Sequence, residues 1–234
     1  MAPNRKTTIV AGVLILISVA ASVVGGTQIL SVIKVPSFLA NIPSNTTHMF
    51  IGVLLELTCA ALVVWIPITL FPILKQHSEK MAVAFVIFRS IEAVFTIVCE
   101  VMVLSLVTLG QEYAGAGASD ASYLSTLATA VVAGHYWAYD MVCIATGIAY
   151  LILFYLCSKS RLLPRFLSIW GLVGMPIFLI LVLSGILANH PGMLFRGEYP
   201  ANIIVLPASL NELFLAVWLI FKGFTPSRYE KDRA

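Results

Sequence analysis

Charge is scarce in this chain, and the shortage excludes most soluble folds. Only 11% of the 234 residues are charged, whereas a soluble domain is about a quarter charged. Hydrophobic residues make up 60% of the chain, which is more than a soluble core can use. The net charge of +3 gives no sign of a nucleic-acid partner, because the basic residues lie in short loops rather than on a soluble face. Lipid is the solvent that suits such a surface.

Several catalytic and redox motifs are missing as well. The sequence has no HExxH pair, no GxSxG elbow and no phosphate-cradling glycine loop. None of the four cysteines belongs to a CxxC motif, and all lie in apolar runs, so we expect small buried side chains rather than disulfides. These cysteines are Cys59, Cys99, Cys143 and Cys157. No resident cofactor is predicted, although a bound cation or lipid would suit the polar residues described below.

What the chain has instead is a set of long apolar runs, each able to cross a bilayer as a helix of about 20 residues. They lack the alternation of membrane β-strands. The runs cover residues 8–30, 49–74, 81–109, 127–157, 166–188 and 201–221. The predicted fold class is all-α: a polytopic membrane bundle of six transmembrane helices in one domain, residues 1–224, with a tail at 225–234. The loop near 111–126, rich in Gly, Ala and Ser, is expected to be long and flexible.

Loop charges predict the orientation. With the N-terminus in the cytoplasm, the inside segments carry eleven Lys and Arg residues and the outside loops only two, Lys34 and Arg196. The eleven are Arg5, Lys6, Lys75, Lys80, Lys159, Arg161, Arg165, Lys222, Arg228, Lys231 and Arg233. Both termini are therefore expected in the cytoplasm.

Ionisable residues inside the predicted spans are the main functional signal. There are seven: Glu56, Arg89, Glu92, Glu100, His135, Asp140 and Glu212. Each unpaired charge near the bilayer centre costs about 2.5–3.5 kcal/mol on insertion scales. We therefore expect these groups to face the bundle interior and to meet one another, water or a ligand.

Helical geometry places part of this set on one face. At 100° per residue, Arg89, Glu92 and Glu100 project within an arc of about 80°, and the first two can pair directly. In the fourth span, GHYWAYD, each ionisable side chain has a tyrosine one turn away. These tyrosines are Tyr136 and Tyr139. The prediction is one polar cavity floored by the arginine.

The sixth span adds an amide and a kink to this cavity. Asn211 precedes Glu212 in the sequence, and Pro207 frees a backbone carbonyl one turn before itself. Kinked helices with freed carbonyls often line cavities in membrane proteins.

Five acids and one arginine leave a formal charge of −4 in the predicted cavity if all ionise and the histidine is neutral. A low-dielectric cavity does not hold such a charge alone, so either several acids keep their protons or a cation lies among them. A static alternative is that the charges only tie helices together. Three residues form a weak candidate metal set of oxygen and nitrogen ligands, namely Glu56, Glu100 and His135.

At FRSIEA, GHYWAYD, RLLPRFLSIWG and LPASLNELFLAVWLIFKGF the chain resembles a prokaryotic six-helix membrane family catalogued as a domain of unknown function (DUF4386-like). The matching positions are Arg89, Glu92, His135, Leu163-Pro164-Arg165 and Glu212. The resemblance covers nearly the whole chain and supports the fold. It implies a prokaryotic inner-membrane protein and brings no activity with it.

Three hypotheses for function remain open at this point. The first is binding or transport of a small molecule or ion, linked to protons or cations. The second is an intramembrane enzyme that acts on a lipid or isoprenoid by acid–base or metal-assisted chemistry. The third is a non-catalytic sensor or a subunit of a larger complex. The sequence indicates membrane lipid as a partner and leaves the oligomeric state open.

Overall fold

The chain folds as a bundle of long helices. The structure is a computed structural model that describes residues 3–198 and 201–225. Within those residues there are six α-helices and no strand, which confirms the predicted fold class, and all six are long and apolar enough to cross a membrane. They are α1 (Pro3–Ile33), α2 (Phe38–Leu74), α3 (Glu79–Gly115), α4 (Ala118–Ser160), α5 (Arg165–Leu187) and α6 (Ala201–Phe221). The predicted tail lies outside the described residues except for Thr225.

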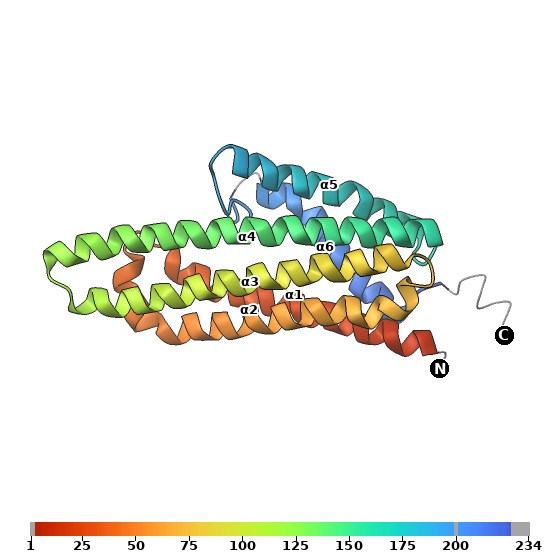
Figure 1. Cartoon of the computed structure of the whole chain (residues 1–234), viewed down its shortest axis with the longest axis horizontal. Coiled ribbons are helices and arrows are strands. Elements are labelled where there is room, and N and C mark those ends of the chain that lie inside the picture. The colour runs from red at the N-terminus through yellow and green to blue at the C-terminus, as the bar shows by residue number, and fades with distance from the viewer. Residues whose placement is uncertain (1–2, 199–200, 226–234) are drawn as a thin grey trace.

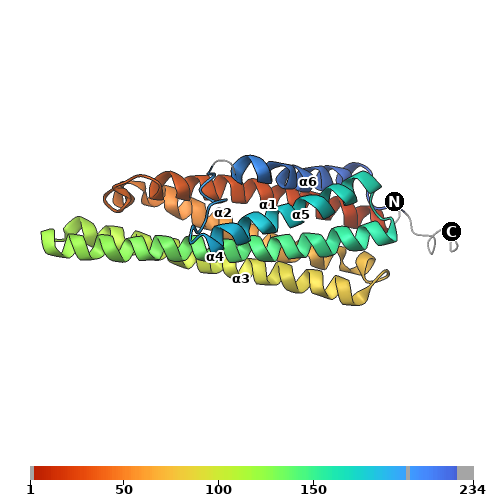
Figure 2. The same ribbon diagram turned by 90° about the horizontal axis from the view of Figure 1, so that it is seen from above.

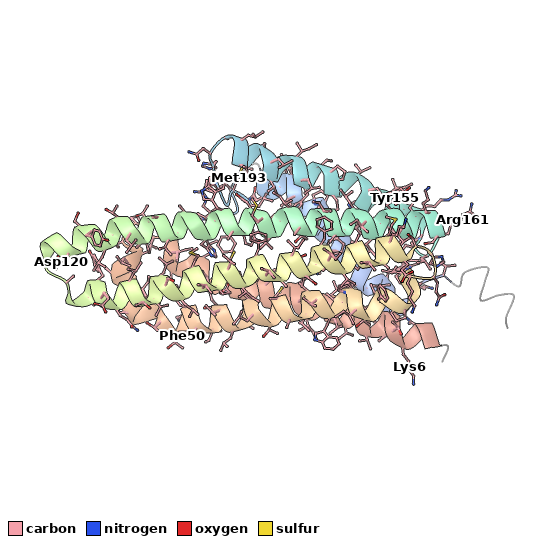
Figure 3. All side chains as sticks on the ribbon, viewed as in Figure 1. Lys6, Phe50, Asp120, Tyr155, Arg161 and Met193 are labelled. Atoms are coloured by element: carbon pink, nitrogen blue, oxygen red, sulfur yellow. The ribbon has the colours of Figure 1, made fainter. Side chains whose placement is uncertain are left out.

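The six helices close into a ring in chain order. Each helix packs against the next one along the chain, and α6 returns to pack against α1 (Figure 1). Viewed from above, α1 begins and α6 ends at the same end of the bundle (Figure 2). Lys6 and Arg161 lie at that end, whereas Asp120 lies at the opposite one (Figure 3).

The connection between α3 and α4 corrects one expectation. A long flexible loop was expected near residues 111–126, but α3 continues to Gly115 and α4 begins at Ala118. The segment has no proline and several alanines, the best helix formers, so both helices extend into it and leave only a short turn between them. The α3–α4 hairpin therefore extends beyond the rest of the bundle (Figure 1). The long connection among the described residues is instead the one after α5, from Ala188 onward.

Local signals explain where helices begin and bend. The Ser78 hydroxyl accepts a hydrogen bond from the Met81 backbone N–H at 3.4 Å, and Glu79 lies in the first turn of α3, where the helix dipole favours an acid. Asn45 leaves helical geometry inside α2 with φ of −117° and marks a kink two residues after Pro43.

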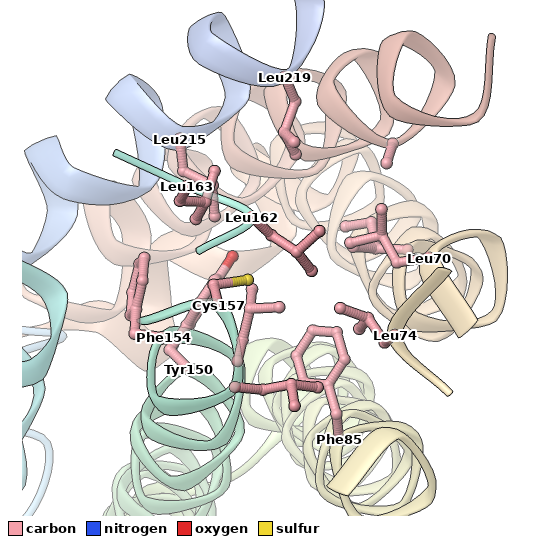
Figure 4. Packing of buried hydrophobic residues seen from close by; sticks show 14 of the residues in the cluster. Leu70, Leu74, Phe85, Tyr150, Phe154, Cys157, Leu162, Leu163, Leu215 and Leu219 are labelled. Carbon is pink, nitrogen blue, oxygen red and sulfur yellow. The ribbon is translucent and has the colours of Figure 1, made fainter. Parts of the chain in front are cut away.

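Two apolar clusters fill opposite ends of the ring. The terminal-end cluster, at the end that holds the start of α1, includes Leu70, Phe85, Phe154 and Leu215 (Figure 4). The hairpin-end cluster, toward the α3–α4 turn, includes Ile42, Met49, Val103 and Leu106. Along α2 and α3, the buried polar residues fall in sequence between the members of these two clusters, and so does Ser18 of α1. The bundle is therefore built as an apolar layer, a polar layer and a second apolar layer.

The seam between α1 and α6 is tight at its terminal end. The Arg5 guanidinium donates hydrogen bonds to the carbonyls of Leu219, Ile220 and Phe221, which are orphaned by the end of α6. About two turns further along α1, a Cβ at Gly12 would lie 2.6 Å from the Ala216 carbonyl oxygen, so only glycine permits this approach. These contacts close the ring where the two chain ends meet.

Candidate functional site

A cavity of about 390 Å³ occupies the polar layer between the two apolar clusters. All six helices contribute to its wall, together with the segment that follows α5. Its polar lining consists of Ser18, Ser22, Glu56, Arg89, Glu92, Thr96, Glu100, His135, Tyr139, Thr146, Ser209 and Glu212. Seven of the ten predicted site residues therefore lie around one space, although they come from α2, α3, α4 and α6.

One part of the cavity wall is a partnered set that we call the arginine cluster: Arg89, Glu92, Tyr150 and Glu212. Arg89 Nη1 donates to Glu92 Oε2 at 2.9 Å and to Oε1 at 3.2 Å, which is the one-turn pair that the spacing predicts. The guanidinium carbon lies 5.1 Å from the centroid of the Tyr150 ring, in reach of a cation–π contact. The Tyr150 hydroxyl donates to Glu212 Oε1. Three helices are thereby joined through one chain of polar contacts.

A second part of the wall is a set with few partners that we call the acid–histidine cluster: Glu56, Glu100 and His135. Glu56 accepts only a long hydrogen bond from Ser22 Oγ, at 3.3 Å, among its side-chain contacts. His135 Nδ1 faces the Cys99 carbonyl oxygen at 3.3 Å. Glu100 Oε2 and His135 Nε2 are buried and have no hydrogen-bond partner among the described residues. This cluster holds polar atoms that a ligand or water would satisfy.

The segment after α5 covers the cavity beside His135. The Phe195 ring lies 5.1 Å from the His135 ring and 4.6 Å from the Tyr139 ring, measured between centroids. The Gly192 backbone N–H donates to Asp140 Oδ2 at 3.0 Å. Gly192 has φ of +68°, a conformation that favours glycine, and a Cβ there would lie 2.7 Å from the Tyr136 side chain. Both the backbone conformation and the lack of space therefore require glycine at this position.

Three predicted site residues lie outside the cavity wall. Asp140 is buried and anchors the covering segment through Gly192. Tyr136 lies under the Arg196 guanidinium, 5.2 Å from ring centroid to Cζ. Asn211 turns toward α5, where its Nδ2 donates to the Leu167 carbonyl at 3.2 Å. Each of them ties elements together, as in the static alternative. The expectation that these three residues line the cavity is corrected accordingly.

Because Asp140 does not line the cavity, the formal charge of the cavity differs from the expected one. Four carboxyls and one arginine line the cavity, which gives a formal charge of −3 if all ionise, instead of the expected −4. The arginine is already paired with Glu92. The surplus therefore resides in Glu56, Glu100 and Glu212, of which only Glu212 has a strong donor, the Tyr150 hydroxyl.

The structure also adds residues that the sequence did not single out. Tyr150 links the arginine cluster, and Phe195 covers the cavity from a segment far along the chain. Thr96 and Thr146 add hydroxyls to the wall, and so do Ser18 and Ser22. Three cysteines assigned only to apolar packing also line the cavity, as free thiols: Cys59, Cys99 and Cys143. The tyrosine repeat of α4 was a usable signal for Tyr150, which lies eleven residues, or three turns, after Tyr139.

No group of three or more His, Cys, Asp or Glu side chains is placed to hold a metal ion within residues 3–198 and 201–225. The weak metal candidates Glu56, Glu100 and His135 line one cavity without forming a ligand set.

Fold and cavity together define a class: an integral membrane protein whose six helices surround a buried, acid-rich cavity. The chain belongs to the family described as a domain of unknown function, DUF4386, whose model matches residues 10–223. No curated protein and no solved structure matches the chain.

Proposed function

We propose that the cavity binds a small solute and that binding, or movement of the solute across the membrane, is linked to protons on the cavity acids. The observation that supports this is a cavity between the two apolar clusters that holds four carboxyls and a single arginine that is already paired. A carboxyl in such a place lowers the energy of the site either by holding a proton or by meeting a cation. Exchange between these two states is the elementary step of proton-linked binding.

The position of the cavity supports the same proposal. Transporters commonly bind substrate near the bilayer midplane, at an interface between bundle halves. Here the cavity lies between two apolar clusters, so a solute inside it is separated from both ends of the ring. A rearrangement of either cluster would open the cavity to one side of the membrane.

Proton movement in proteoliposomes tests the proposal. Vesicles that enclose a pH-sensitive dye are given a cationic solute, an anionic solute or a neutral one, with protein-free vesicles as the leak control. We expect one class to move protons with the wild-type protein. Glu100→Gln and Glu212→Gln each remove one carboxyl of the surplus from the cavity and should abolish that movement. Glu112→Gln, an exposed change on α3, is the matched control and should leave it intact.

Two results would contradict the proposal: full activity in both cavity variants, or no proton movement with any of the three solute classes. An acid–base enzyme acting on a lipid predicts a different outcome in the same vesicles. It would convert a membrane lipid to a new product without net proton transfer between compartments, and lipid mass spectrometry would detect that product.

For orientation, we propose that both termini face the cytoplasm of a prokaryotic cell and that the protein lies in its inner membrane. Lys6 and Arg161 gather at the end of the bundle where α1 begins, as the positive-inside rule requires of a cytoplasmic end (Figure 3). Fusions of green fluorescent protein and of alkaline phosphatase to the C-terminus test this. Fluorescence without phosphatase activity is expected, and the reverse would refute the orientation.

A further inference from the structure

The seam between α1 and α6 changes character along its length. At the terminal end, Gly12 and Ala216 bring the two backbones together. Further along the same two helix faces, Val23 of α1 is 63% exposed and Ser209 of α6 is exposed, yet both line the cavity. The cavity therefore reaches the surface of the bundle between α1 and α6. We call this opening the lateral window.

The surroundings of the lateral window are apolar. Val19, Val205 and Leu213 line the cavity near it and are only partly buried. On the outer surface beside them, Ile203 is 58% exposed and Leu206 is 52% exposed. In a membrane-spanning bundle such a surface faces the lipid chains, and charged groups are avoided there. A molecule that passes through this window must carry an apolar part.

The inner end of the same space has the opposite character. Glu100 and His135 line the cavity, are 3% and 1% exposed, and each has a buried polar atom without a hydrogen-bond partner among the described residues. Glu56 lies close enough to Glu100 for their charges to interact, and no Lys or Arg lies in this cluster. The aromatic rings of Tyr139 and Phe195 stand beside it, and ring faces attract substituted ammonium groups. These features select a positive group.

From these observations we infer that the cavity takes an amphiphilic organic cation, a substituted ammonium with an apolar group, which enters from the bilayer through the lateral window. The ammonium lies between Glu56 and Glu100 beside the two aromatic rings, and the apolar group lies along the window toward Val23. A volume of about 390 Å³ falls within the range of small-molecule pockets. The inference rests on the proposed function, since it names the substrate class of the same cavity.

Binding of the cation is expected to displace a proton from the acid pair, so affinity should rise with pH. Other titratable and charged groups also line the cavity around this pair. They are Cys59 on α2, Arg89, Glu92 and Cys99 on α3, His135, Tyr139 and Cys143 on α4, and Glu212 on α6. Arg89 and Glu92 neutralise each other, and His135 repels the ligand when protonated, which also favours binding at higher pH.

Calorimetric titration of the protein in lipid nanodiscs tests the inference with a matched pair of probes. Benzyltrimethylammonium carries the positive charge, and neopentylbenzene has the same shape with carbon in place of nitrogen. We expect the cation to bind and the neutral probe to bind far more weakly. Glu56→Gln and Glu100→Gln should each lower the affinity for the cation by about 10-fold, which corresponds to about 1.4 kcal/mol of binding free energy. Glu112→Gln, an exposed change on α3, should leave affinity unchanged.

The window has its own test. Ser209→Phe narrows the opening, whereas Leu206→Phe changes an exposed residue of α6 that does not line the cavity. We expect Ser209→Phe to slow the association of dodecyltrimethylammonium, a probe whose chain stays in the bilayer, and Leu206→Phe to leave it unchanged. If only the short-chained benzyl probe binds, the ligand is a free solute and lateral entry of a lipid amine is refuted.

The outcomes separate this inference from the proposed function. Equal affinity for the charged and neutral probes, or wild-type affinity in both Gln variants, overturns the inference. Proton-linked movement of an anion would then leave the proposed function intact. Cation binding without proton release, measured by comparing buffers of different ionisation enthalpy, would keep the ligand class but overturn the proton linkage and the expected dependence of affinity on pH.

Discussion

The arginine cluster and the acid–histidine cluster line the same cavity, yet their polar atoms are satisfied to different degrees. In the arginine cluster, both carboxylates have a donor, because Glu92 receives two hydrogen bonds from Arg89 and Glu212 receives one from Tyr150; only Arg89 Nε is left without a partner among the described residues. In the acid–histidine cluster, Glu100 Oε2 and His135 Nε2 have no partner among the described residues. Arg89 and Glu92 are as deeply buried as Glu100 and His135, so exposure to solvent does not explain the difference between these two pairs; Glu212 is only partly buried.

The difference suggests a division of labour. A buried charge that is fully paired can hold helices together, whereas removal of one partner leaves an uncompensated charge and is strongly destabilising. A buried carboxyl without a partner stabilises nothing, and its site is one in which a ligand supplies the missing contact. We therefore expect substitutions in the first cluster to affect stability most and substitutions in the second to affect binding.

The largest effect on stability is expected from Arg89→Met. The change leaves Glu92 buried without its cation, at a loss of about 3 kcal/mol in the free energy of unfolding. Denaturation of the purified protein in mixed micelles measures this. The double variant Arg89→Met/Glu92→Met should recover most of the loss, because no unpaired charge remains. If the single variant is as stable as the double one, the pair is not a structural tie.

The closed and open parts of the α1–α6 seam provide the next comparison. Gly12→Leu places a side chain where a Cβ alone would lie 2.6 Å from the Ala216 carbonyl oxygen, and overpacking of this kind costs about 1–3 kcal/mol. Ser209→Leu, at the lateral window, adds similar bulk where space is open and should cost less than about 0.5 kcal/mol. Equal losses would mean that the seam is equally tight along its length.

Sequence reasoning predicted the helices because lipid-facing and core-facing residues are both apolar, which makes each span a continuous signal. The extension of α3 and α4 beyond the predicted spans was missed because it does not give this signal. Residues such as Gly115 and Asp120 are polar or small, and hydropathy cannot distinguish a helix outside the bilayer from a loop. Local propensity, high for the alanines there, was the better guide.

The cavity was predictable only where one helix determines it. Arg89, Glu92 and Glu100 share a face because of helical periodicity alone. The positions of Asp140 and Asn211 depend on Gly192 and on the Leu167 carbonyl, which lie far away in the chain, so no spacing rule could have assigned them to structural contacts. Phe195 was overlooked for the same reason, whereas the tyrosine repeat of α4 did offer a signal for Tyr150.

A smaller loss of stability is expected from Tyr150→Phe. The ring and its contact with Arg89 remain, and only the hydrogen bond to Glu212 is removed. Hydrogen bonds between membrane helices contribute about 0.6 kcal/mol on average and at most about 1.7 kcal/mol. Tyr155→Phe, a matched change at an exposed tyrosine of the same helix, should leave the unfolding free energy unchanged. If the two variants are indistinguishable, the Tyr150 contact does not stabilise the bundle.

The smallest effect on stability is expected from Glu100→Gln, and its sign decides the comparison. The amide removes an acid that repels Glu56 and has an unpartnered oxygen, so the unfolding free energy should stay the same or rise slightly. The same variant should bind benzyltrimethylammonium about 10-fold more weakly than the wild-type protein does. Gain of stability with loss of function is typical of residues kept for binding rather than for folding. A stability loss of more than about 1 kcal/mol would instead place Glu100 among the structural contacts, like Arg89 and Glu92. The arginine cluster and the acid–histidine cluster would then have the same role.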